Sequence, residues 1–252
     1  MSARFWFTLI LAATLIPWAH VSAAGTSGSS FSPNWAPDGK RIVFVFRRDG
    51  DQQIHVMADD GSGRTQLTNP KSDEENDSPL WSPDGSRIAF VRKIWAGAPQ
   101  TSVGPGIIII TRPSIRQIYV MNPDGSAEKQ LTSSGSSYFP VWSPDGRHIA
   151  FVSDRDGGQL IFVMNADGTE QRRLTQPSSR RGSLEFGLRW SPDGQRIVFT
   201  SNRDGTEQIY VVKADGSELK RLTSTGIVGL VGPPMADGLP SFPIAKGSRT
   251  SM

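Results

Sequence analysis

Short apolar stretches alternate with polar turns along most of the chain, and one order of stretches recurs four times. Each copy opens with a tryptophan, which is followed by one small residue (Ala or Ser) and then by Pro-Asp-Gly. The four tryptophans are Trp35, Trp81, Trp142 and Trp190. An apolar stretch follows (RIVFV, RIAFV, HIAFV or RIVFT), then a turn, a second stretch (IHVM, IYVM, IFVM or IYVV) and the ending QLT or RLT. Alternating stretches rich in β-branched and aromatic residues, such as 41–45 and 208–211, predict β-strands.

Turn-forming residues separate the predicted strands. In Pro-Asp-Gly the proline presets φ, the aspartate can bond its own following backbone and the glycine accepts positive φ. We therefore expect a structural turn role for the aspartate of each copy, at Asp38, Asp84, Asp145 and Asp193. Asp-Gly pairs such as Asp49-Gly50 and Asp156-Gly157 predict hairpins between the second and third strands of a copy.

Each copy therefore predicts a four-stranded antiparallel meander, and units of this size are typical of β-propeller blades. The expected fold is an all-β propeller with four clear repeats and a degenerate or truncated fifth. The blades are expected near residues 31–77, 78–137, 138–185 and 186–223, and residues 224–252 are expected to be the repeat remnant and a flexible tail. We expect Trp35, Trp81, Trp142 and Trp190 to form structural core between blades.

The composite P-x-W-S-P-D-G-x-R-I-A-F-V-S-D-R-D-G, followed by I-Y-V-M-N-A-D-G and R-L-T, resembles the WD40-like (PD40) repeat of the TolB family. Residues 140–175 match it nearly throughout, and the resemblance covers roughly residues 31–223. It implies a non-catalytic protein-protein interaction module of the periplasm or cell envelope, with Tol-Pal-like partners. In that family the propeller meets a peptidoglycan-associated lipoprotein. The repeat also resembles propellers attached to prolyl-oligopeptidase-type peptidases. The chain departs from the family because four repeats replace six and no α/β domain is expected before them.

The first 24 residues are expected to be a signal peptide. Arg4 precedes an apolar run from Phe5 to Trp18, which is short of the roughly 20 residues that span a bilayer. Small residues at 22–24 favour cleavage near Ala23 or Ala24, followed by a short linker over residues 25–30. An uncleaved anchor helix is the alternative. The mature chain is expected to be periplasmic or secreted, with no membrane span.

Composition gives little support to catalysis. With no cysteine and three histidines, the chain cannot form a disulfide framework or a thiolate metal site and has little material for histidine chemistry. His55 and His148 fill ordinary repeat positions, and no G-x-S-x-G motif occurs. The formal charge of +3 is small for this length and does not indicate a nucleic-acid-binding surface. We expect no enzyme activity, no catalytic residue, no cofactor and no metal.

One insertion breaks the repeat pattern. In the second unit 26 residues separate Val91 from Ile118, where the other units have 8. Insertions in repeat proteins map to loops that often bind partners. The predicted partner-binding residues are Trp95, Ile107, Ile108, Ile109, Ile110, Arg112 and Arg116. An elongated hairpin that folds over the channel or covers an open sheet edge is the alternative.

Other functions stay open at the level of sequence. One is a small-ligand or glycan-binding propeller, or a metal-dependent hydrolytic one, which would need acidic residues from single repeats to converge on one face. Another is a truncated remnant of a larger propeller. Four repeats could close as a small ring, remain an open arc with exposed sheet edges, or self-associate with a second chain.

Overall fold

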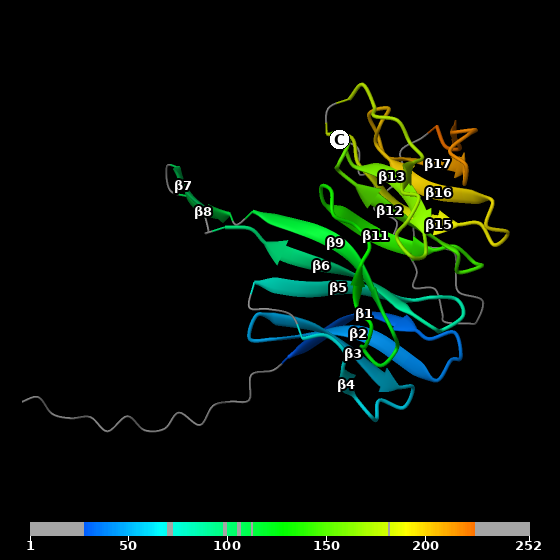
Figure 1. Ribbon diagram of the computed structural model, residues 1–252. Helices are drawn as coiled ribbons and strands as arrows, with labels where there is room; N and C mark the ends of the chain where they lie inside the picture. Colours follow the sequence, from blue (N-terminus) through cyan, green and yellow to red (C-terminus); the bar gives the residue numbers. More distant parts are fainter. Residues whose placement is uncertain are drawn as a thin grey trace, which may run out of the picture.

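The computed structural model describes residues 28–69, 73–97, 100–104, 107–111, 113–180 and 182–224. These residues form four antiparallel four-stranded sheets and one two-stranded ribbon (Figure 1). No helix in this part of the chain is long and apolar enough to cross a bilayer. The predicted signal peptide and residues 225–252 of the predicted remnant lie outside the described residues.

Each sheet corresponds to one sequence repeat and is called a blade. The first blade contains β1 (Ser29–Trp35), β2 (Arg41–Arg48), β3 (Asp51–Ala58) and β4 (Thr65–Gln66). The second contains β5 (Glu74–Trp81), β6 (Ile88–Trp95), β9 (Ser114–Met121) and β10 (Lys129–Gln130). The third contains β11 (Ser137–Trp142), β12 (His148–Ser153), β13 (Leu160–Asn165) and β14 (Arg172–Arg173). The fourth contains β15 (Glu185–Trp190), β16 (Arg196–Ser201), β17 (Gln208–Lys213) and β18 (Lys220–Arg221).

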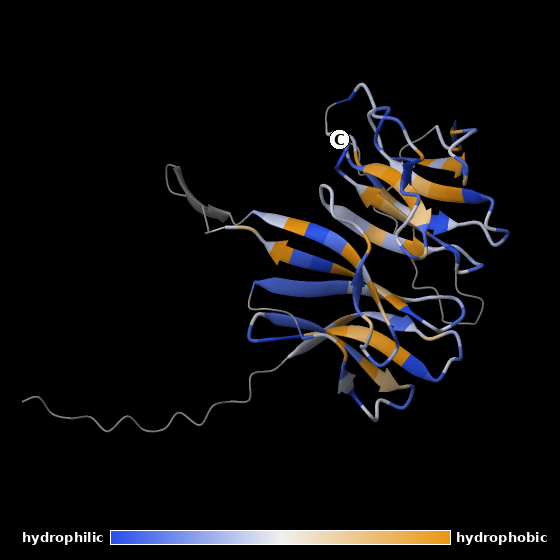
Figure 2. Cartoon of the chain, in the orientation of Figure 1, coloured by the Kyte–Doolittle hydropathy of each residue, from blue (hydrophilic) through white to orange (hydrophobic). Residues whose placement is uncertain are grey.

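Strand order within the blades confirms the predicted meanders. Sequential strands pair antiparallel in the first, third and fourth blades, and the order in the second is β5-β6-β9-β10. The insertion lengthens the β6–β9 hairpin and carries the separate ribbon of β7 (Gln100–Gly104) and β8 (Ile107–Thr111). Apolar residues gather in the middle strands of each blade and hydrophilic ones at the turns (Figure 2).

The Pro-Asp-Gly turns are held by the aspartate. Asp84 accepts hydrogen bonds from the Ser82 hydroxyl at 2.6 Å and from the Ser86 N–H at 3.0 Å, and the Ser82 bond leads in lowering the pKa of Asp84 to about 2. The carboxylates of Asp145 and Asp193 accept the same pair of bonds, from a serine hydroxyl and a backbone N–H. In the first blade Ala36 replaces the serine, and Asp38 accepts from the Lys40 N–H at 2.9 Å.

Consecutive blades meet through two different apolar faces, and the contact between two blades is called a seam. The earlier blade presents an aliphatic face, and the later blade presents an aromatic face that includes its tryptophan. At the seam between the second and third blades the aliphatic side is Ala89, Ile118, Val120 and Leu131, and the aromatic side is Trp142, Ile149, Phe151, Phe162 and Met164. The other two seams have the same composition. The core of this molecule therefore lies between blades.

The tryptophans correct one expectation from the sequence. Trp81 and Trp142 are buried in seams, and the Trp142 indole donates a hydrogen bond to the Leu80 carbonyl of the preceding blade at 3.3 Å. Trp35 occupies the same repeat position but is 51% exposed. The tryptophan packs on the blade before its own, and no described blade precedes the first. Trp35 is therefore not part of the core in this structure, contrary to the prediction.

A stacked ring pair lies at the centre of each blade, on adjacent middle strands. The pairs are Phe44–His55, Phe90–Tyr119, Phe151–Phe162 and Phe199–Tyr210, with ring centroids 5.6–5.7 Å apart. In each blade an arginine guanidinium lies within 6 Å of these rings, from Arg64, Arg92, Arg155 and Arg203. Such cation-π contacts stabilise by about 0.5–2 kcal/mol each.

The first blade differs because its second ring is a histidine. His55 is buried between Phe44 and Phe46, and its Nδ1 accepts a hydrogen bond from the Arg64 Nε at 3.4 Å. Burial first, and the Arg64 charge second, lower the pKa of His55 from 6.5 to about 4. The neutral imidazole is therefore the form that the folded protein holds.

This histidine predicts a pH-dependent loss of stability. Between pH 6.5 and 4 the unfolded chain binds a proton that folded His55 resists, so the free energy of unfolding falls as pH drops through this window. Allowing for solvent screening, we expect a loss of about 1–2 kcal/mol. His55→Phe introduces the phenylalanine that the third blade has at the same repeat position, Phe162, and should remove the pH dependence that His55 causes. Urea unfolding of both proteins at several pH values checks the prediction, and parallel stability curves would contradict it.

Candidate functional site

The innermost strands of all four blades, β1, β5, β11 and β15, line a common axial face. Two hollows open along this face, one of about 790 Å³ at the side of the tryptophans and one of about 710 Å³ at the side of the β2–β3 hairpin. Ser78, Phe139 and Phe186 line both hollows, so the two adjoin along the axis. Residues from all four blades line each of these two hollows.

A bulge in each innermost strand shapes the axial face. The strand register shifts at the same place in every blade, and the bulged residue has a left-handed backbone, with φ of 52° at Ser32, 53° at Ser78, 51° at Phe139 and 66° at Gly187. Bulges re-aim side chains and recur near binding sites. Only glycine adopts this conformation without steric cost, so the bulky Phe139 is held in a strained backbone.

Phe139 gives the axial face an apolar centre. Its ring is 51% exposed, and Leu184 beside it on the lining is 41% exposed. Charged side chains surround this centre on the hairpin side: Arg47, Glu75, Asp77, Lys93 and Arg116. An exposed aromatic group ringed by charged residues is the usual composition of a protein-binding surface.

Glu185 anchors the start of β15, next to Leu184 and Phe186. Its carboxylate is buried, accepts a hydrogen bond from the Thr175 hydroxyl at 2.6 Å and pairs with Arg203. Burial raises the pKa of Glu185 although these partners oppose the shift. In the other blades the equivalent threonine hydroxyl donates to a glutamine of its own blade, as Thr132 does to Gln117. In the third blade Leu160 has the position of that glutamine and cannot accept a hydrogen bond. The acceptor for Thr175 of the third blade therefore comes from the fourth blade, as the Glu185 carboxylate.

The structure brings part of the predicted partner-binding set to the axial face. Arg116 lines the hairpin-side hollow, and its guanidinium lies 5.5 Å from the centroid of the Tyr138 ring. Trp95 lies next to that hollow, because it contacts two residues of the lining. The Lys93 Nζ lies 3.4 Å from the centroid of the Trp95 ring, and the Glu75 carboxylate accepts a hydrogen bond from the indole at 3.3 Å.

The rest of the predicted set lies elsewhere. Ile107, Ile108, Ile109 and Ile110 belong to β8, in the ribbon that points away from the four blades in Figure 1. The ribbon does not fold over the axial face or against another sheet edge, which were the alternatives for the insertion. Arg112 lies outside the described residues. Sequence reasoning missed Phe139 and Leu184, and the break in repeat pattern at Phe139, where other units have Ser or Gly, was the signal available for the first.

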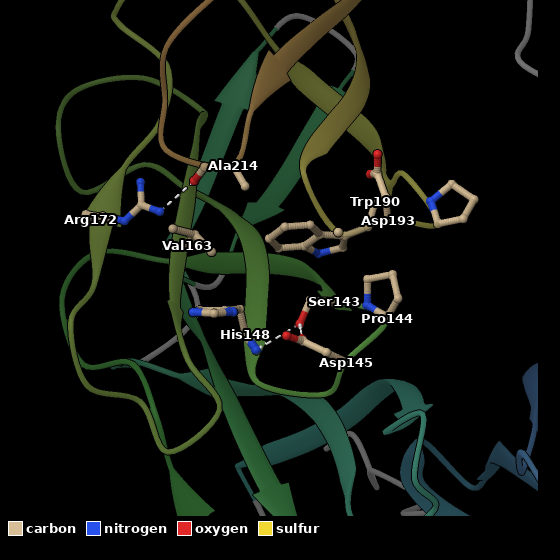
Figure 3. Close-up of a pocket in the computed structure, with 11 residues that line it drawn as sticks. Ser143, Pro144, Asp145, His148, Val163, Arg172, Trp190, Asp193 and Ala214 are labelled. Atoms are coloured by element: carbon tan, nitrogen blue, oxygen red, sulfur yellow. Dashed lines mark hydrogen bonds between the residues drawn. The ribbon is translucent and has the colours of Figure 1, made fainter.

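A further hollow of about 410 Å³ opens in the seam between the third and fourth blades. Figure 3 shows His148 and Trp190 facing it, with the Ser143–Asp145 turn at its edge. At the two earlier seams an arginine fills the corresponding place, and the guanidiniums of Arg41 and Arg87 lie 4.7 and 5.7 Å from the centroids of the Trp81 and Trp142 rings. His148 is shorter than arginine, so this seam is incompletely packed. The hollow is best explained as a packing defect.

No group of three or more potential metal ligands occurs among the residues that the structure describes. The pKa values of the turn aspartates Asp84, Asp145 and Asp193 are lowered, first by a hydrogen bond from a serine hydroxyl and then by one from a backbone N–H. The axial face itself offers exposed apolar side chains and charged groups of both signs, which are suited to contact with a protein surface.

Comparisons with known proteins give a family match and several similar proteins. The TolB beta propeller domain family matches residues 14–105 and 134–240. The TolB protein of the Tol-Pal system from Bordetella pertussis is 34% identical over 132 residues, which is 52% of this chain and 26% of that protein. Dipeptidyl-peptidase 5 from Porphyromonas gingivalis is 41% identical over 52 residues, or 20% of this chain and 8% of the peptidase. The crystal structure of TolB from Acinetobacter baumannii covers 79% of this chain and 44% of its own, with a TM-score of 0.58 and 24% identity, and shows the shared fold.

His148→Arg tests the explanation of the seam hollow. An arginine should stack on Trp190 as Arg87 does on Trp142, and should stabilise the protein by about 0.5–1 kcal/mol, or about 1–4 °C in Tm. His148→Ala, which cannot stack, is the matched control and should give no gain. Thermal unfolding of the three proteins checks this. Equal stability of the Arg and Ala variants would show that the hollow does not arise from the missing stack.

Proposed function

Since the chain belongs to the TolB beta propeller domain family, we propose that it is an exported, non-catalytic module that binds a protein of the cell envelope through its axial face. The family match supports the class of function. The observation that carries the choice of surface is Phe139, a half-exposed aromatic ring in a strained backbone between two hollows. Backbone strain of this kind, about 1–3 kcal/mol, tends to persist at functional sites.

The chemistry of the face supports a protein partner. Its centre offers Phe139 and Leu184 for burial, and its rim offers Arg47, Lys93 and Arg116 together with Glu75 and Asp77. A mixed rim of both signs favours a partner with its own alternating charges, and such a rim sets orientation and association rate more than affinity. The β6–β9 hairpin carries Arg116 and Trp95 and forms one wall beside this face.

The name of the Bordetella relative suggests the partner. That protein belongs to a Tol-Pal system, so we propose a Tol-Pal component, with the peptidoglycan-associated lipoprotein as the first to test, and a periplasmic location. The chain spans about a quarter of that relative, so its partner is inferred from the propeller alone. The match to the peptidase covers 52 residues, about the length of one repeat, and supports a shared scaffold with no transferred catalytic residue.

Phe139→Gly separates binding from folding. Glycine occupies the same bulge as Gly187 in the fourth blade, so relief of the left-handed strain, about 1–2 kcal/mol, should offset the lost packing of a half-exposed ring. Binding should weaken by about 1–2 kcal/mol, or about five- to thirtyfold, as for an aromatic residue at an interface centre. Calorimetric titration with the soluble domain of the peptidoglycan-associated lipoprotein of the same organism measures this, alongside urea unfolding.

Leu219→Ser is the matched control, because Leu219 is also a large exposed apolar residue, 40% exposed, in the segment between β17 and β18 that lines neither axial hollow. Its binding should equal that of the wild type. No binding by the wild-type chain would overturn the choice of partner. Binding that Phe139→Gly leaves intact would overturn the choice of surface.

A further inference from the structure

The four blades leave one unpaired face at each end of the array. Every seam pairs the aliphatic face of one blade with the aromatic face of the next. The first blade therefore ends the array with an aromatic face, and the fourth blade ends it with an aliphatic face. Among the described residues, the strands of the first blade make no extensive contact with those of the fourth.

The aliphatic end repeats the pattern of the buried aliphatic faces. Val198, Ile209, Val211 and Leu222 point away from the third blade, since Phe199 and Tyr210 on the other side pack toward it. The third blade's residues at these repeat positions, Ala150, Ile161, Val163 and Leu174, are 0–4% exposed. In the fourth blade the first three are half-buried, and Leu222 is 52% exposed.

The aromatic end likewise repeats the other half of a seam. Trp35, Ile42 and Met57 stand at the repeat positions of Trp81, Ile88 and Met121. The second-blade residues are 0–4% exposed, whereas Trp35 is 51% exposed and Ile42 and Met57 are half-buried. Each end is therefore complementary to the other.

Two small contacts recur at every seam and show how closely the ends would match. A Cβ on Gly85, Gly146 or Gly194 would lie 3.7 Å from the proline Cδ of the preceding blade. The leucine of each QLT or RLT ending packs on the turn glycine of the next blade, as Leu67 does on Gly125 and Leu131 on Gly168. At the aromatic end Gly39 and Gly61 have no described atom within 4 Å of such a Cβ. At the aliphatic end Pro192 and Leu222 are exposed.

The charged groups at the ends also correspond. Arg41 and Arg87 stack on the tryptophan of the following blade, and Arg196 has their repeat position in the fourth blade. Lys129 and Arg172, from the last strands of their blades, donate to backbone carbonyls of the following blade at Asp167 and Ala214. Lys220 has the position of Lys129 in the fourth blade. Arg196 and Lys220 are thus placed to meet Trp35 and the Asp59 turn of another aromatic end.

We propose that the aliphatic end of one chain docks on the aromatic end of a second copy, forming a fourth seam of the same kind between molecules. Leu222 then packs on Gly61 of the other copy, Pro192 packs on Gly39, and Arg196 stacks on Trp35. Two copies joined at both ends make a closed ring, and copies joined at one end make an open chain. This association is independent of any partner at the axial face.

A second copy fits these ends better than the chain's own C-terminal residues. An aliphatic face is covered in all three seams by a four-stranded sheet that carries a tryptophan. Residues 225–252 contain no tryptophan, and their 28 residues are shorter than one repeat of about 46. They therefore offer no indole to repeat the tryptophan contact of the other seams.

Mixing two end variants tests the proposal. Leu222→Glu damages the aliphatic end and Trp35→Glu damages the aromatic end, and both residues are about half exposed, so folding should be retained, as circular dichroism would check. Ile115→Glu, which alters a 45% exposed apolar residue of β9 in the second blade, is the matched control because Ile115 lies on neither end and lines neither axial hollow. Light-scattering mass is measured on the purified chain at concentrations up to about 100 µM.

We expect the wild type and the Ile115→Glu control to associate, reaching at least twice the mass of one chain at the upper concentrations. Each end variant alone should weaken association by about tenfold or more. An equimolar mixture of the two variants should again reach twice the chain mass, because each contributes its intact end to one seam.

A monomeric wild type at all these concentrations would overturn the proposal. So would association that the end variants do not weaken, or a mixture that behaves like its separate components, since either would show contact through another surface. If two like ends made an isologous contact, one of the two end variants would associate as the wild type does. That result would also contradict the proposal.

Discussion

The structure depends on the packing of an aliphatic face against an aromatic face at each seam. A single four-stranded sheet has two apolar faces and cannot bury either alone, so stability comes from stacking blades. Because the two faces differ, the stack has a direction. The tryptophan always packs backward on the preceding blade, and the leucine at the end of a repeat always packs forward on the next turn glycine. This direction explains why the same residue is buried at Trp142 and half exposed at Trp35.

Much of the fold could be predicted because its signals are local and repeated. The alternation in 41–45 and 208–211 and the Asp-Gly turns specify strands and hairpins without reference to distant residues, and β2 and β17 contain these segments. The arginines over the ring pairs could not be predicted in this way. Arg155 and Arg203 share one repeat position, just before the Asp-Gly of the hairpin, but Arg92 lies within a strand and Arg64 beyond a later turn, so no single sequence position marks all four. The exposure of Trp35 was also missed, because a repeat does not reveal from its own residues whether it is terminal.

The axial face illustrates a different limit. Phe139, Leu184 and Arg47 come from three blades and lie more than 40 residues apart in sequence, so only the arrangement of blades brings them together. The insertion was the visible exception to the repeat, and it does supply Arg116 to this face. The isoleucine run predicted to bind a partner lies in a separate ribbon. The repeat builds a scaffold that TolB proteins and peptidases share, while the residues that differ between repeats give this chain its own surface.

The most direct test of the seam as the organising contact compares one substitution at two equivalent positions. Trp142→Phe removes a buried indole and its hydrogen bond to Leu80, and should lower the free energy of unfolding by about 1–3 kcal/mol. Trp35→Phe alters the same repeat position where no described blade precedes it, and should change stability by about 0.5 kcal/mol or less. Urea unfolding of dilute protein measures both. Equal losses would contradict the account, because they would show that the tryptophan stabilises its own blade and not the seam.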